Sequence, residues 1–388
     1  MPEEIPVVAP AANGGRRPRP TINDIARLAE VNPSTVSRAL NRPGRVNART
    51  EERIRKVAAD LNYTLNPMAR ALPTGRSNTL GLILSDITNP AYFGLVRGAQ
   101  RVAMAEGFTL VLAESQESPQ RELEKAQRIL RSVDGLVLVG TRLSDEEIQA
   151  LRASKPLVLI NREVSGVPAV VPDIAPGIRD ALAHLAEIGH RSLAFVSGPS
   201  HSWISRRRWD HIMGEALSLG MSIVEIGPKA PSVDGGRDCI TRVLASGVTT
   251  VITYNDLMAI GLLNACREHD VDVPGRLSII GFDDIFGSDF TSPPITTIRT
   301  PFGRAGDVAM RRLVAAVTAK ASSEQPNLST EFVLRGSTAR PGQRRAFIPF
   351  QPPTTATGDT RTAPFPASTP SSTPVVEDDG GDTRWTVA

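Results

Sequence analysis

The sequence predicts a small all-α domain at the N-terminus, followed by an α/β core of two doubly wound halves. Three observations lead to this prediction. Apolar residues recur at helical spacing between capping residues in 21–61, short apolar runs alternate with longer amphipathic stretches from 79 onward, and the residues after 341 are rich in Pro, Thr, Ser and Gly. With 388 residues, 40% of them hydrophobic, the chain is long enough for two or three domains.

Positive charge is concentrated in the N-terminal part of the chain. Residues 1–76 contain 13 Lys and Arg against 7 Asp and Glu, a net charge of +6, whereas the whole chain has a net charge of +3. Residues 1–19 show no periodicity, so we expect a disordered basic arm there. A basic segment with patterned helices is typical of a domain that binds nucleic acid.

Residues 21–41 predict two short helices joined by a tight turn. Thr21 caps the first helix with Asp24 at its third position. The apolar stripe of this helix consists of Ile22, Ile25, Ala26 and Ala29. Asn32 caps the second helix, which begins at Pro33, where a missing N–H costs no hydrogen bond.

The second helix directs small polar side chains outward. Its inward positions are Val36, Ala39 and Leu40, and its outward positions are Ser34, Thr35, Ser37 and Arg38. Hydroxyls and an arginine at an exposed helix N-terminus can approach phosphates and base edges, as in a helix-turn-helix. By itself, the pattern of these two helices is equally consistent with a helix-turn-helix and with an ordinary αα-hairpin.

Two further helices follow. Asn47 caps a third helix, whose apolar face closes a small three-helix core. Asn66 to Leu72 form a capped helix of barely two turns, stopped by Pro73 and Gly75. A helix of this length is marginally stable in water by itself.

From 79 onward the pattern predicts buried strands separated by helices. The expected strands are Thr79–Asp86, Phe108–Ser115, Gly135–Gly140, Pro156–Asn161, Ala169–Val171, Ser192–Ser197, Thr249–Asn255 and Leu277–Asp283. This alternation predicts parallel sheets with helices on both faces. About 260 residues of it indicate two doubly wound halves.

Polar residues follow many of these strands, where ligands bind in doubly wound sheets. They are Asp86, Asn89, Tyr92, Ser115, Asn161, Arg162, Asn255, Asp256, Asp283 and Asp284. Carboxylates, amides, an arginine and an aromatic ring suit a polyhydroxylated ligand, because each hydroxyl both donates and accepts a hydrogen bond. Alternatively, Asp86, Asn255 and Asp283 are helix caps and Arg162 is a surface residue.

The chain resembles the lactose-repressor (LacI/GalR) family of bacterial regulators. The motifs that carry this resemblance are T-I-x-D-I-A-x-x-A, S-T-V-S-R-A-L-N, R-V-N-x-x-T, L-N-Y and N-P-x-A-R-A-L, spread over about 55 residues. The resemblance implies a helix-turn-helix domain, a hinge helix that folds on operator DNA, and a periplasmic-binding-protein-like core. It implies DNA contacts at Thr21, Ser34, Thr35, Ser37, Arg38, Asn41, Asn66, Ala69 and Leu72, with Leu72 wedged into the minor groove.

The same resemblance sets the domain boundaries and the effector site. We expect a disordered arm at 1–19, the helix-turn-helix domain at 20–65, the hinge and linker at 66–78, the core at 79–341 and a disordered tail at 342–388. One subdomain of the core would be 79–176 and 302–326, and the other 177–301 and 327–341. The strand ends predict effector contacts at Asp86, Asn89, Tyr92 and Ser115, and the resemblance supports Arg162, Asn255 and Asp283 and adds Arg208.

Several positions depart from the family pattern. Glu30 stands in the turn where glycine is usual, and a left-handed Glu costs roughly 1 kcal/mol, so a slightly altered turn is expected. His211 replaces a glycine near Arg208, Ala91 replaces a common aromatic residue, and 229–236 lacks another aromatic residue. A pocket of different size from that of familiar sugar binders is therefore expected.

The sequence gives no support for an enzyme, a cofactor or a metal site. G-x-G-x-x-G and P-loop motifs are absent, and His184, His190, His201, His211 and His269 lack metal-binding spacing. The two cysteines, Cys239 and Cys266, are each expected inside an amphipathic helix and buried, as in a reducing cytoplasm. The lack of a long apolar run predicts no membrane partner.

These observations predict a cytoplasmic transcriptional regulator, more specifically a repressor that binds double-stranded operator DNA as a homodimer. A small effector, a sugar or sugar derivative, would bind in the cleft between the subdomains. A tetramer stays open, as does the alternative of an intracellular carbohydrate-binding sensor without gene control.

Overall fold

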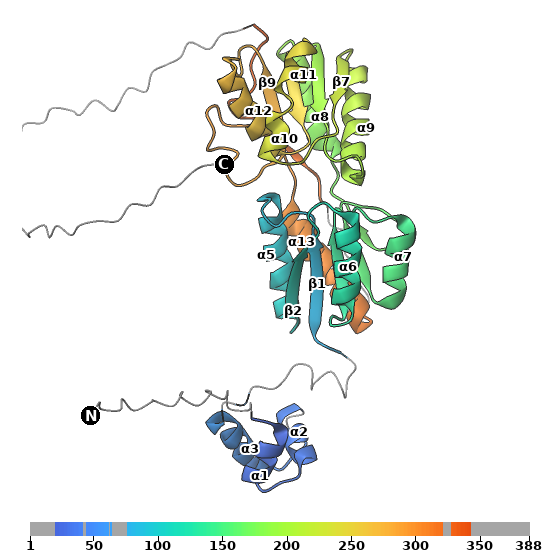
Figure 1. The fold of residues 1–388 in the computed structure, drawn as a ribbon, viewed down its shortest axis with the longest axis vertical. Coiled ribbons are helices and arrows are strands. Elements are labelled where there is room, and N and C mark those ends of the chain that lie inside the picture. The colour runs from blue at the N-terminus through green and yellow to red at the C-terminus, as the bar shows by residue number, and fades with distance from the viewer. Residues whose placement is uncertain (1–19, 42–43, 62, 64–75, 321–326, 343–388) are drawn as a thin grey trace, which may run out of the picture. The chain divides into compact units, whose positions relative to one another are not determined.

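The computed structural model describes residues 20–41, 44–61, 63, 76–320 and 327–342 (Figure 1). The predicted arm at 1–19, the hinge helix at 66–72 and the tail beyond 342 lie outside the described residues.

The described residues of 20–61 form a three-helix head. Its helices are α1 (Ile22–Leu28), α2 (Pro33–Asn41) and α3 (Ala48–Asp60). The predicted caps of the first and third helices are confirmed. Thr21 and Asp24 form a capping box on α1, and the Asn47 side chain accepts a hydrogen bond from Arg49 N on α3. Buried Ile25, Val36 and Ile54 meet in the core of the head.

The turn between α1 and α2 contains a strained residue. Glu30 has a φ of 51°, in the left-handed region that favours glycine. The backbone therefore keeps a left-handed residue in this turn although the side chain is Glu.

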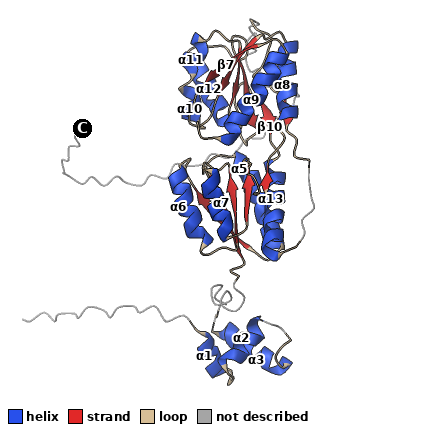
Figure 2. Ribbon diagram, turned by 90° about the vertical axis from the view of Figure 1, so that its right-hand side faces the viewer, coloured by secondary structure: helices blue, strands red, loops and turns tan. Residues whose placement is uncertain are grey.

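The first α/β half contains a five-stranded parallel sheet with the order β2-β1-β3-β4-β5. Its strands are β1 (Thr79–Leu84), β2 (Thr109–Glu114), β3 (Gly135–Val139), β4 (Leu157–Ile160) and β5 (Ala169–Val170). Its helices are α5 (Ala91–Ala105), α6 (Pro119–Leu130), α7 (Asp145–Ser154) and α13 (Phe302–Thr318). α5 and α13 pack on one face, and α6 and α7 pack on the other (Figure 2).

The second half contains a six-stranded sheet with the order β11-β10-β9-β8-β6-β7, in which only β11 is antiparallel. Its strands are β6 (Ser192–Val196), β7 (Ser222–Ile226), β8 (Thr250–Thr253), β9 (Ser278–Asp283), β10 (Thr296–Arg299) and β11 (Glu331–Val333). Its helices are α8 (Ala175–Glu187), α9 (Trp203–Ser218), α10 (Val233–Arg237), α11 (Ile240–Ala245) and α12 (Asp256–Glu268).

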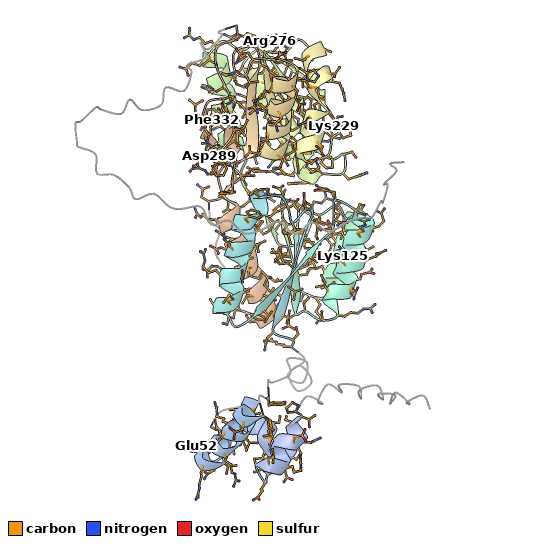
Figure 3. The ribbon with its side chains drawn as sticks, turned by 60° about the vertical axis from the view of Figure 1, so that its left-hand side comes forward. Glu52, Lys125, Lys229, Arg276, Asp289 and Phe332 are labelled. Carbon is orange, nitrogen blue, oxygen red and sulfur yellow. The ribbon has the colours of Figure 1, made fainter. Side chains whose placement is uncertain are left out.

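Side chains fill the space between the sheets and their helices, whereas exposed Glu52 of the head and Arg276 of the second half extend outward (Figure 3).

The predicted fold class is confirmed: an all-α head is followed by two doubly wound α/β halves. All eight predicted runs form strands, and β7, β10 and β11 were not predicted. The placement of Cys239 inside a helix is wrong, because Cys239 and Asp238 lie between α10 and α11, but both cysteines are buried as predicted.

α13 leaves the second sheet after β10 and returns to the first half, where it packs closely on α5. A Cβ atom at Gly98 of α5 would lie 2.2 Å from the carbonyl oxygen of Gly303, and one at Gly306 would lie 2.2 Å from that of Leu95. Glycine at these positions lets the two helix backbones touch. The close packing fixes the start of α13 beside the start of α5, next to the strand ends that carry the site.

Candidate functional site

The outward face of α2 carries most of the side chains predicted to contact DNA. Ser34 and Arg38 are exposed, and Thr35 and Ser37 are half-buried. Thr21, which caps α1, is also exposed. α2 contains no acidic residue, so no carboxylate on this helix neutralises Arg38. Such a surface can approach a phosphate or a base edge.

The other predicted DNA contacts lie outside the described residues. These are the side chain of Asn41 and the hinge residues Asn66, Ala69 and Leu72. Their roles stay predictions.

In the core, residues at the carboxyl ends of strands from both sheets line one small cavity. Five of the eight predicted effector contacts lie on it: Asn89, Tyr92, Arg208, Asn255 and Asp283. The cavity measures about 20 Å³, which is space for about one water molecule. A ligand of sugar size therefore requires the walls of this cleft to separate.

Arg208 and Asp283 form a buried ion pair in the cleft. Arg208 Nη2 donates to Asp283 Oδ1 at 2.6 Å, and the two side chains are 3% and 7% exposed. The guanidinium carbon lies 3.7 Å from the ring centroid of Phe282, and Arg208 Nη1 donates to the carbonyl of Tyr254. Burial raises the pKa of Asp283, and the charge of Arg208 opposes that shift.

The backbone around this pair is strained. Asp283 has a φ of 103° and the next residue, Asp284, has a φ of 55°. Both values lie in the region that favours glycine, and such strain is common at binding sites. Asn161, at the end of β4 on the opposite wall, has a φ of 57°.

Asn255 and Asp256 begin α12 at the end of β8. The Asn255 side chain accepts a hydrogen bond from Met258 N at 3.0 Å, so it caps the helix while it lines the cavity. Asp256 is fully buried and accepts hydrogen bonds from Thr297 Oγ1 at 2.6 Å and Ile285 N at 2.8 Å. Burial raises the pKa of Asp256 to about 8, against the effect of these two hydrogen bonds.

The sequence prediction missed a second ion pair of the cleft. Arg142 lines the cavity, and its Nε and Nη2 donate to Glu117 Oε2 at 2.9 and 2.6 Å. Its backbone N–H donates to buried Glu122 at 2.9 Å, and burial raises the pKa of Glu122. Arg142 could have been found by the rule used for the others, because it follows the end of β3.

Aromatic rings complete the cavity. Tyr92 and Phe302 meet edge to face with centroids 6.0 Å apart, and Tyr254 also lines the space. The Tyr92 hydroxyl lies 3.1 Å from Ser85 Oγ, and burial raises the pKa of Tyr92.

Three predicted contacts do not line this cavity. Asp86 accepts hydrogen bonds from Thr88 N and Oγ1 at 2.8 and 2.6 Å, which is a local turn. Ser115 is buried beyond the end of β2. Arg162 donates to Asp145 at 2.6 Å. Asp86 and Arg162 are thus held by nearby residues, and none of the three is gathered with the other five.

Within the described residues, no helix is long and apolar enough to cross a bilayer. The same part of the chain holds no cluster of His, Cys, Asp and Glu suited to a metal ion.

A helix-turn-helix head joined to two α/β halves around a polar cleft defines a class of transcription regulators built on a ligand-binding core. The model of the lacI family of bacterial regulatory proteins matches residues 21–66, and that of the periplasmic binding protein-like domain matches residues 182–338.

Individual proteins agree with these matches. The regulator RegA of Clostridium saccharobutylicum is 31% identical over 333 residues, and the ribose operon repressor of Escherichia coli K12 is 29% identical over 338 residues; each alignment covers 82% of this chain and 99% of the relative. The lac repressor dimer bound to operator and an anti-inducer has a TM-score of 0.74 at 25% identity, covering 82% of this chain and 99% of that one. The chain belongs to the lacI family and is a DNA-binding transcriptional repressor.

Proposed function

We propose that the protein binds a near-palindromic operator as a homodimer, and that a carbohydrate or carbohydrate derivative in the cleft controls this binding. The observation that carries the proposal is the pairing of two sites in one chain. The outward face of α2 presents Ser34 and Arg38, and the cleft gathers Arg208, Asp283 and Asn89. The similar structure of the lac repressor is a dimer on its operator, and a relative is named for the ribose operon.

The cleft chemistry favours a polyhydroxylated ligand. Arginine donors, carboxylate acceptors and an amide can satisfy hydroxyls, which donate and accept at once. The rings of Tyr92, Tyr254 and Phe302 supply faces for the C–H surface of a sugar. Arg208 Nε is also buried without a protein acceptor, so a donor is left for a ligand.

Control would act through two parts of the protein, the cleft and the hinge helix. The cleft must open to admit a ligand, because its cavity is about 20 Å³ when closed. In the proposed mechanism, opening changes the spacing of the two hinge segments of the dimer, and so decides whether both can fold and insert Leu72 into the minor groove.

The test is selection of bound fragments from the host's DNA, followed by footprinting of the selected sites with and without candidate sugars. A protected palindrome of two major-groove half-sites that a sugar releases or strengthens supports the proposal. Protection without sequence preference at every salt concentration and with every sugar would contradict it.

Variants locate the DNA contacts. Arg38→Ala is expected to weaken operator binding by roughly tenfold to a hundredfold, the effect of one specific contact. Arg53→Ala is the matched control, because Arg53 is exposed on α3 and its loss changes the net charge equally. Leu72→Ala should also weaken operator binding; unchanged affinity would exclude the hinge from the mechanism.

A further inference from the structure

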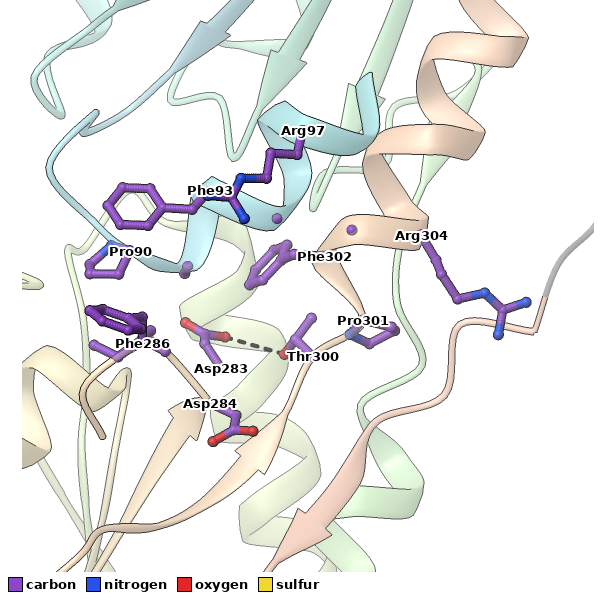
Figure 4. A pocket seen from close by; sticks show the side chains of 14 residues that line it. Pro90, Phe93, Arg97, Asp283, Asp284, Phe286, Thr300, Pro301, Phe302 and Arg304 are labelled. Atoms are coloured by element: carbon purple, nitrogen blue, oxygen red, sulfur yellow. Dashed lines mark hydrogen bonds between the residues drawn. The ribbon is translucent and has the colours of Figure 1, made fainter. Parts of the chain in front are cut away.

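The two sheets carry buried carboxylates at opposite ends of their strands. Asp283, at the carboxyl end of β9, lines the cleft and accepts a hydrogen bond from Thr300 Oγ1 at 3.2 Å (Figure 4). Asp134 directly precedes β3 and is 7% exposed. Because β1 and β3 run parallel, Asp134 lies at the end of the first sheet where the chain that comes from the head enters β1.

Asp134 accepts hydrogen bonds from two consecutive residues of this entering segment. Its Oδ1 accepts from Ser77 N at 2.7 Å and from Ser77 Oγ at 3.0 Å, and its Oδ2 accepts from Asn78 N at 2.8 Å. Asn78 has a φ of 49°, and successive N–H groups around a left-handed residue form a concave site for an anion. The Asp134 carboxylate therefore takes the place of a bound anion at the start of the core.

The core holds Asp134 itself in place. Its N–H donates to Thr79 O at 2.7 Å, which joins it to the start of β1. The preceding residue, Val133, is 1% exposed, and its carbonyl accepts a hydrogen bond from Lys155 Nζ at 3.1 Å. A carboxylate on such a fixed support determines the direction in which the segment that it binds leaves the core.

The donors that Asp134 binds lie near the surface. Ser77 is half-buried and Asn78 is exposed. If the carboxylate is removed, water can satisfy both N–H groups, and the buried sheet beside them keeps its own contacts. Loss of the Asp134 carboxylate is therefore expected to free the segment more than it destabilises the core.

We propose that Asp134 is a positioning residue for operator binding. It fixes Ser77 and Asn78, so that the hinge segments of the dimer start from fixed positions on their cores. Without it, each segment gains conformational freedom in the free repressor that must be lost again on DNA, and operator affinity falls. This inference rests on the proposed hinge mechanism.

The first measurement is hydrogen exchange of the full chain without DNA, read by mass spectrometry in peptides that span 76–80. Asp134→Ala is expected to speed exchange there at least about tenfold, the factor that one hydrogen bond to a charged group supplies. Asp134→Asn keeps one acceptor oxygen and should give an intermediate rate. Unchanged exchange in Asp134→Ala would overturn the inference, because the carboxylate would then not hold the segment.

The second measurement is affinity for the selected operator, by fluorescence anisotropy of the labelled DNA. Asp134→Ala is expected to weaken operator binding at least about tenfold. Glu147→Ala is the matched control, because Glu147 accepts a hydrogen bond from Ser144 N at 2.8 Å in the same half, at the start of α7. This control should lower the urea midpoint of the core about as much as Asp134→Ala does, and leave operator affinity unchanged.

The failure of this inference differs from the failure of the operator proposal. If Asp134→Ala binds the operator as tightly as Glu147→Ala does, the carboxylate has a structural role alone and the inference is wrong. If the wild type itself binds DNA without sequence preference, the operator proposal is wrong, and the affinity of the wild type reveals this without any variant.

Discussion

The head and the cleft between the two α/β halves use opposite kinds of buried side chain. Among the described residues of 20–63, every buried side chain is apolar, and the Arg27–Asp24 pair is 76% and 40% exposed. In the cleft the Arg208–Asp283 pair is 3% and 7% exposed. A charge lost from the head leaves its partner in water, whereas a charge lost from the cleft leaves its partner buried and unpaired.

The largest expected effect on stability appears when an aspartate is replaced by asparagine in the cleft and, for comparison, in the head. Asp283→Asn should lower the free energy of unfolding of the core by about 3 kcal/mol, because it leaves Arg208 buried without a counter-ion. Asp24→Asn in the capping box should leave this transition unchanged. Urea unfolding followed by the fluorescence of Trp203 and Trp209, which lie in α9, reports the core.

A double variant separates the lost pair from other damage. Arg208→Met combined with Asp283→Asn removes both charges and should recover part of the stability lost by Asp283→Asn alone. Equal unfolding midpoints for Asp283→Asn and the wild type would show that the pair does not stabilise the closed cleft.

This difference also explains what could be predicted from the sequence. The caps Thr21 and Asn47 and the apolar stripes of the head depend on residues a few positions apart, and spacing alone predicts them. Arg208 and Asp283 are 75 positions apart. Its position at a strand end indicated Asp283, and the family resemblance indicated Arg208, but neither could show that the two side chains pair.

The errors have physical causes too. The strand-end rule could have found Arg142, but not its ion pair, because its partner, Glu117, lies in a left-handed turn that no local pattern indicates. β7 and β11 were missed because, as edge strands, they are half-exposed and lack a continuous apolar run. β10 is buried but contributes only four residues, two of them threonines.

The stability of the core is also expected to depend on pH, through the buried side chain of Asp256. Asp256 has a pKa of about 8 in the folded core, well above the usual value of an unfolded chain. Between about pH 4 and 8 the folded state keeps a proton that the unfolded state has released, so rising pH favours unfolding. Asp256→Asn should remove this dependence, because its amide can donate to Thr297 Oγ1 and its carbonyl can accept from Ile285 N.

The measurement is the free energy of unfolding of both proteins by urea between pH 5 and 8. The wild type should lose stability relative to Asp256→Asn by up to about 1.4 kcal/mol per pH unit, the limit for one proton. Parallel curves for the two proteins would show that Asp256 is ionised in the folded core throughout this range.

The smallest expected effect lies in the head and concerns the backbone instead of charge. Glu30 has a φ of 51°, and Glu30→Gly should stabilise the head by about 1 kcal/mol because glycine adopts this conformation without a steric clash. Native-state hydrogen exchange of the full chain should show about fivefold slower exchange for amides of α1 and α2 and no change in the core. Glu30→Ala removes the same charge but keeps a Cβ atom, so it should leave exchange unchanged. If both variants slow exchange equally, the carboxylate destabilises the head, and the contrast between an apolar head and a charged cleft would need revision.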